Sequence, residues 1–129
     1  MRIGPLKLKL QLMCGDAVAF GPGKADLLDA IAREGSIAAS GRALGMSYRR
    51  TWLLVDEMNR CFETKLVETL SGGGRERGAR VTVQGKSVLA AYRTLERDTA
   101  AIHDSEIYRQ LVQHLRDMPT PVKTLPPGD

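Results

Sequence analysis

Hydrophobic and polar residues alternate strictly near the start of the chain. Residues 6–13 read LKLKLQLM, and this period of two predicts a half-buried strand whose lysines suit the edge of a sheet. Residues 14–23 contain three glycines and Pro22, which predict a loop. The spacing of apolar residues becomes helical from Lys24 to Arg33, and Gly35 is expected to end that helix.

Two further helices are predicted on either side of a tight turn. Ser36 stands where an N-cap is expected for a short helix with small apolar residues, and Gly45 interrupts the pattern. Ser47 is a second candidate N-cap, for a helix that runs to about Cys61. A short helix, a turn and a second helix with basic residues in its first turn are typical of a helix-turn-helix.

The second helix of this pair divides into two faces. One face is expected to contain Tyr48, Thr51, Trp52, Val55, Met58 and Phe62, and the opposite face Arg49, Arg50, Leu53 and Glu57. Trp52 is expected to lie in the core, because it shares its face with Val55 and Met58. Tyr48 fits two interpretations, a core anchor or a surface contact.

A loop rich in glycine and arginine lies between two strand-like segments. Lys65–Leu70 and Ala79–Val83 predict the strands, and the loop at 71–78 reads SGGGRERG. Consecutive glycines allow the backbone to approach another surface closely, and the arginines can neutralise phosphates. The loop is therefore interpreted as a wing against DNA, or else as a flexible hairpin tip with solvated charges. It lacks the lysine pattern and the strand-to-helix setting of a phosphate-binding loop.

The remaining apolar residues recur with helical period from Thr82 to Asp117. The phase slips near His103, which predicts a break there and a last helix capped by Asp104 or Ser105. The apolar seam of this segment predicts a two-fold dimer interface, which helix-turn-helix proteins use to reach two half-sites. The alternative is that the seam only covers the core of its own monomer.

These elements together predict a mainly α-helical chain with a small β-hairpin. The expected architecture is a winged helix-turn-helix with an N-terminal strand and a long C-terminal dimerisation helix. Residues 1–117 are expected to form this domain. Residues 118–129 contain four prolines and are expected to form a disordered tail.

The composition of the chain narrows the classes of function. It has 129 residues and a net charge of +4, which favours an anionic partner. No apolar run approaches the roughly 18 residues of a membrane span, so a cytoplasmic protein without a membrane partner is expected.

Cys14 and Cys61 are interpreted as reduced thiols packed as small apolar groups. His103 and His114 are isolated, and no catalytic pattern stands out, so the chain is not expected to be an enzyme.

Positive charge concentrates in the helix-turn-helix and hairpin segments. Eight basic and five acidic residues lie between Gly35 and Val81, so most of the excess charge of the chain falls there. Arginine in the first turn of a recognition helix can bond guanine in the major groove. The residues expected to contact DNA are Ser36, Ser47, Tyr48, Arg49, Arg50, Gly72, Gly73, Gly74, Arg75, Arg77 and Arg80.

Several of these segments resemble one known family. The segments GSIAASGRALGMSYRRTWLLVDEMN, LVETLSGGG and GARVTVQGKSVLAAY resemble the N-terminal DNA-binding domain of ModE-type molybdate-responsive transcriptional regulators, which is akin to the LysR-type winged helix. The resemblance covers roughly residues 5–105. Its most specific part is Ser47, Tyr48 and Arg49 followed by Trp52 and the pair Met58–Asn59.

The resemblance implies a homodimer that binds palindromic double-stranded DNA and regulates transcription. Full-length members continue into molybdate-binding domains, to which this sequence has no matching positions, so no cofactor is expected although molybdate remains an option. Two alternatives stay open beside the DNA-binding regulator. One is a winged-helix module that binds a protein partner, and the other is a small protein that binds molybdate or another oxyanion at a helix N-terminus or a dimer interface.

Overall fold

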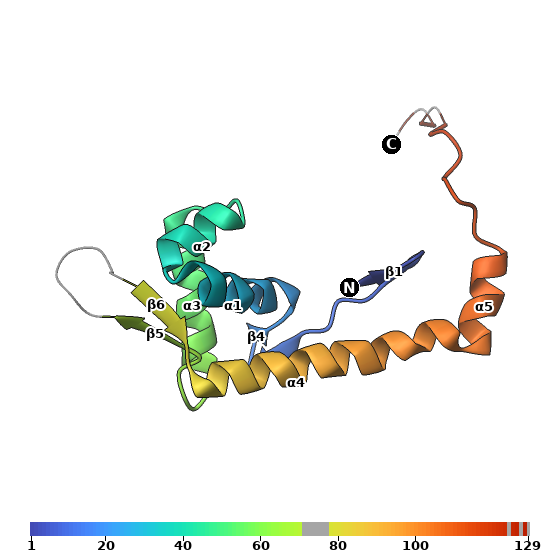
Figure 1. Ribbon diagram of the computed structural model, residues 1–129. Coiled ribbons are helices and arrows are strands. Elements are labelled where there is room, and N and C mark those ends of the chain that lie inside the picture. The colour runs from blue at the N-terminus through green and yellow to red at the C-terminus, as the bar shows by residue number, and fades with distance from the viewer. Residues whose placement is uncertain (71–77, 124, 127, 129) are drawn as a thin grey trace.

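The computed structural model describes residues 1–70, 78–123, 125, 126 and 128 of the chain (Figure 1). The strands are β1 Arg2–Ile3, β2 Leu6–Lys7, β3 Leu12–Cys14, β4 Ala17–Phe20, β5 Val67–Leu70 and β6 Gly78–Val81. The helices are α1 Pro22–Glu34, α2 Ile37–Ala43, α3 Tyr48–Cys61, α4 Val83–Ala100 and α5 Glu106–Gln113, and a 3-10 turn covers Ala101–Asp104.

One hydrophobic core joins the helices of the first half to the hairpin and the start of α4. Helix α1 packs against α2, α3, α4, β4 and β6, so it lies at the centre of the fold. Its apolar side chains Leu27, Leu28 and Ile31 are fully buried, and Phe20 packs edge-on against Tyr92 of α4. Helix α4 runs away from this cluster and carries α5 at its far end (Figure 1).

Polar side chains fix where most helices begin. The hydroxyls of Ser36, Ser47, Thr82 and Ser105 each accept the backbone N–H three residues later, which satisfies a donor that the helix itself cannot. The predicted N-caps Ser36 and Ser47 are confirmed, and Ser105 is the cap of the last helix.

Two side chains hold the outer elements to the core. Asn59 of α3 accepts the N–H groups of Leu66 and Val67 and donates to the carbonyl of Val67, which ties α3 to β5. Arg93 of α4 bonds Asp26 and Asp29 of α1 at 3.0 and 2.9 Å. Burial lowers the pKa of the Arg93 guanidinium, but its bonds to these carboxylates and to Glu96 outweigh that and raise the pKa above its ordinary value.

The N-terminal segment differs from the predicted single strand. Residues 6–7 of the alternating run pair with β1, and residues 12–13 belong to β3, which pairs with β4 in what was expected to be a loop. Residues 8–11 between them belong to no strand. The alternation itself is present, since Leu8 and Leu10 are half-buried between exposed lysines. The carbonyl of Leu10 instead accepts the Tyr92 hydroxyl at 2.8 Å. Docking on α4 therefore replaces strand pairing for this stretch.

The predicted fold as a whole is wrong. The chain is an α+β structure with three separate two-stranded antiparallel sheets, whereas one hairpin and one N-terminal strand were expected. The long C-terminal helix ends at Ala100, because the 3-10 turn and the Ser105 cap start α5 as a separate helix. The predicted break and the last helix capped by Ser105 are confirmed, and α5 runs in a different direction from α4 (Figure 1). A winged helix with a single long C-terminal helix does not describe this arrangement.

The packing of α2 on α3 depends on the absence of a side chain at Gly41. A Cβ there would lie 2.4 Å from the Thr51 hydroxyl and 3.1 Å from the Met46 carbonyl. We predict that Gly41→Ala lowers the free energy of unfolding by about 1–3 kcal/mol, as overpacking of a tight interior usually does. Urea denaturation followed by circular dichroism measures this change.

Gly23→Ala is the matched control, because a Cβ at this helical glycine meets no atom within 4 Å. Alanine should stabilise that exposed position by up to about 1 kcal/mol. A Gly41→Ala protein as stable as the unsubstituted chain would contradict the proposed close contact.

Candidate oxyanion surface on helix α3

The first turn of α3 is held rigidly. The Ser47 hydroxyl accepts the Arg50 N–H at 3.1 Å, and the Ser47 carbonyl accepts both the N–H and the hydroxyl of Thr51. Thr51 is fully buried where Gly41 lies against it. The turn between α2 and α3 therefore fixes the position of the groups at the start of α3.

Unpaired positive groups gather at this helix start. Arg49 and Arg50 are exposed, and neither forms an ion pair within the part of the chain that the structure describes. In the same described part, the backbone N–H groups of Tyr48 and Arg49 have no hydrogen-bond acceptor. The first turn also carries no acidic residue. A helix N-terminus with free N–H groups and nearby arginines favours an anion.

The arginines border a hollow of about 410 Å³ along α3. Its lining consists of Ser47, Arg49, Arg50, Leu53, Leu54, Glu57 and Arg60. Toward the C-terminal end of α3, the charges of the groove are already paired: Arg60 bonds Asp56 at 2.9 Å, and Glu57 bonds Lys24 at 2.5 Å. At the N-terminal end of α3, the positive charges of Arg49 and Arg50 are not paired within the described residues. We call this hollow the α3 groove.

Large apolar side chains extend this surface along α3. Tyr48, Trp52 and Leu53 are 46%, 45% and 48% exposed. The prediction that Trp52 lies in the core is wrong, because the buried stripe of α3 is narrow and consists of Thr51, Val55 and Met58. Tyr48 is not a core anchor, since nearly half of its surface is exposed.

The other predicted contact residues lie apart from the α3 groove or outside the described residues. Ser36 caps α2, where its hydroxyl accepts the Ala39 N–H at 3.0 Å. Arg80 lies on β6 and bonds Glu68 at 3.0 Å, because the β5–β6 register places these two residues opposite each other. Its charge is therefore matched by a neighbouring carboxylate. The predicted residues Gly72, Gly73, Gly74, Arg75 and Arg77 lie outside the described residues.

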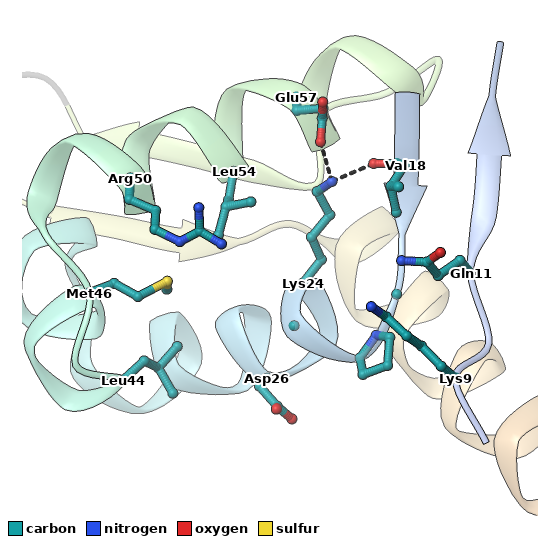
Figure 2. A pocket seen from close by; sticks show the side chains of 13 residues that line it. Lys9, Gln11, Val18, Lys24, Asp26, Leu44, Met46, Arg50, Leu54 and Glu57 are labelled. Atoms are coloured by element: carbon teal, nitrogen blue, oxygen red, sulfur yellow. Dashed lines mark hydrogen bonds and ion pairs between the residues drawn. The ribbon is translucent and has the colours of Figure 1, made fainter. Parts of the chain in front are cut away.

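A second hollow shares Arg50, Leu54 and Glu57 with the α3 groove, and Figure 2 shows the side chains that line it. It has a volume of about 510 Å³ and separates the N-terminal segment and the start of α1 from α3. It was not predicted from the sequence, because it depends on Lys24, a helical lysine that is only 5% exposed. Lys24 donates to Glu57 and to the carbonyl of Val18, and no sequence pattern signals that burial. We call this hollow the α1–α3 pocket.

The two thiols also come together in the structure. Burial raises the pKa of the Cys61 thiol, and a hydrogen bond with the Cys14 thiol raises it further. Cys14 is exposed, so the expectation that it packs as a small apolar group is wrong.

Within the described residues, no three His, Cys, Asp or Glu side chains are placed to hold a metal ion. None of the described helices has the length and apolar character that crossing a membrane requires.

Comparison with known proteins gives relatives of which several are named for molybdenum. The chain is 40% identical over 92 residues to the molybdenum-pterin-binding protein MopA of Rhodobacter capsulatus, which covers 71% of the chain and 35% of MopA. It is 39% identical over 70 residues to the molybdenum transport protein ModE of Azotobacter vinelandii, which covers 54% of the chain and 26% of that protein. It is 36% identical over 87 residues to the DNA-binding transcriptional dual regulator ModE of Escherichia coli K12, which covers 67% of the chain and 32% of the regulator. No family model matches the chain.

The chain thus spans between about a quarter and about a third of the length of these relatives. These names correct the resemblance that was predicted from the sequence. That prediction was a LysR-like, winged-helix DNA-binding domain without a cofactor. Proteins named for binding molybdenum-pterin are among the relatives, so the expectation of no cofactor is wrong. The names describe binding, transport and regulation, and none of them names an enzyme. The chain is similar to part of proteins named for molybdenum-pterin binding, for molybdenum transport and for transcriptional regulation.

Proposed function

We propose that the chain binds a tetrahedral oxyanion, molybdate, in the α3 groove as its part in molybdenum-dependent regulation. The observation that carries this proposal is the pair of unpaired arginines, Arg49 and Arg50, beside the free N–H groups at the start of α3. The names of the relatives support molybdate as the ion, since they include molybdenum-pterin-binding proteins and molybdenum transport proteins.

The chemistry of the groove suits a doubly charged oxyanion. Two backbone N–H groups and the positive end of the α3 dipole provide fixed donors that need no rearrangement. Guanidinium groups bind oxyanions through paired, charge-assisted hydrogen bonds, which are roughly twice as strong as neutral ones. Since Lys24 already neutralises Glu57, no free carboxylate of the groove opposes the anion.

A second candidate ligand is the phosphate backbone of duplex DNA, which offers the same oxyanion chemistry. The observation that favours it is the exposed row of Tyr48, Trp52 and Leu53 next to the arginines, because this surface is wider than one small ion needs. The relative from Escherichia coli K12 is named a DNA-binding transcriptional regulator. Under this alternative, Ser47, Tyr48, Arg49 and Arg50 contact the duplex.

A homodimer remains part of both proposals. Helices α4 and α5 and the turn between them expose Leu95, Ile102, Ile107 and Leu111. These side chains extend beyond the hydrophobic core, which α4 reaches through Val88, Leu89 and Tyr92. A second copy of the chain would cover this apolar surface.

We predict that the chain takes up molybdate saturably and that Arg49→Glu weakens the affinity at least tenfold. The substitution removes a charge-assisted bond and adds a repulsive charge, and tenfold corresponds to about 1.4 kcal/mol. Isothermal titration calorimetry measures both dissociation constants. Arg97→Glu on the exposed side of α4 makes the same change in net charge and should leave the affinity unchanged. Absence of saturable uptake, or equal weakening by both substitutions, would contradict molybdate binding in the groove.

For DNA, we predict that Arg49→Ala and Arg50→Ala each reduce the salt dependence of binding by about one counterion, as loss of one phosphate contact does. Fluorescence anisotropy with the promoter duplex upstream of the gene, across a salt series, measures this slope. A scrambled duplex distinguishes specific from non-specific binding. Binding with unchanged slopes would place the duplex elsewhere on the chain. Molybdate uptake without any DNA binding would leave the first proposal alone.

A further inference from the structure

The α1–α3 pocket has the dimensions of a small-molecule site. Its volume of about 510 Å³ lies within the range of about 300–1,000 Å³ that is usual for ligand pockets. Figure 2 shows Lys9 and Gln11 from the N-terminal segment on one side and Arg50 and Leu54 from α3 on the other.

The charges around the pocket leave two cations unpaired. Of the acidic residues, Glu57 bonds Lys24, and Asp26 bonds Arg93 at 3.0 Å. Lys9 and Arg50 form no ion pair within the described residues. Arg93 is shared with two further carboxylates, Asp29 and Glu96. The lining itself carries three cations, Lys9, Lys24 and Arg50, against two acidic residues, Asp26 and Glu57, so its net charge is positive.

Further donors and an apolar wall complete the pocket. Helix α1 begins in its lining at Gly21, which gives no side-chain cap, and Pro22 has no N–H. Within the described residues, the N–H groups of Gly23 and Lys24 have no acceptor. The apolar part of the lining comes from Val18, Leu44, Met46 and Leu54. An anionic head group and an apolar body thus both have complementary surfaces.

We propose that the α1–α3 pocket binds a small organic anion, a flat apolar body that carries one carboxylate, sulfonate or phosphate. The head group lies between Lys9, Arg50 and the start of α1, and the body lies on Leu44, Met46 and Leu54. Arg50 lines both this pocket and the α3 groove. An anion in the pocket therefore draws Arg50 away from the groove and weakens oxyanion binding there. This coupling rests on the proposed function, whereas binding in the pocket does not.

The test uses 8-anilino-1-naphthalenesulfonate, an aromatic sulfonate whose fluorescence rises in an apolar site. The full chain should give a saturable increase, and Lys9→Glu should weaken the affinity at least about tenfold, because it replaces a charge-assisted contact by a repulsive charge. Lys7→Glu is the matched control: Lys7 is an exposed lysine of the same segment that does not line the pocket, and it should change the affinity less than twofold. Both lysines are exposed, so both variants should keep the circular dichroism spectrum of the unsubstituted chain.

Equal dissociation constants for the Lys7 and Lys9 variants, or no saturable fluorescence, would overturn the pocket proposal. A second titration separates it from the proposed function: saturating the pocket with the sulfonate should weaken molybdate binding severalfold in calorimetry. Lys9-dependent binding of the sulfonate in a chain that takes up no molybdate would support the pocket and contradict the proposed function. The opposite result is molybdate binding that Arg49→Glu weakens, together with sulfonate binding that Lys9→Glu leaves unchanged. It would support the proposed function and contradict the pocket proposal.

Discussion

The whole candidate site depends on the close contact between Gly41 of α2 and Thr51 of α3. Because Gly41 has no side chain, the Thr51 hydroxyl fits beside it and bonds the carbonyl of Ser47 at 2.7 Å. That bond and the Ser47 cap fix the first turn of α3, and the N–H groups of Tyr48 and Arg49 in this turn have no acceptor among the described residues. A helix start that is held in this way presents its donors to an anion without further ordering.

The electrostatics of the chain follow from which charges the fold pairs. Buried Lys24 neutralises Glu57, Arg93 holds Asp26, and Asp56 holds Arg60. What remains near α3 is positive and unpaired, which explains how a chain with a modest net charge of +4 offers a strongly cationic groove. Arg50 borders both the α3 groove and the α1–α3 pocket, so the two hollows compete for a single guanidinium.

Local chemistry allowed part of this structure to be predicted from the sequence. The caps Ser36 and Ser47, the turn at Gly45 and the break before Ser105 depend only on neighbouring residues, and they are where the sequence placed them. The exposure of Trp52, the burial of Lys24 and the Glu68–Arg80 pair depend on which elements meet in space, so periodicity could not predict them. The single N-terminal strand was wrong for the same reason, since its two ends pair in separate sheets and the carbonyl of Leu10 between them bonds α4. The predicted resemblance to a DNA-binding domain without a cofactor was corrected by the relatives, which include molybdenum-pterin-binding proteins.

The measurement that tests the central claim most directly is a titration of the ¹⁵N-labelled chain with molybdate, followed by two-dimensional amide NMR. Oxyanion binding in the α3 groove predicts saturable shifts that are largest for the free N–H groups of Tyr48 and Arg49, whose signals should move downfield as they bond the oxyanion. Saturable shifts that centre on other residues and leave these two amides unmoved would contradict this account.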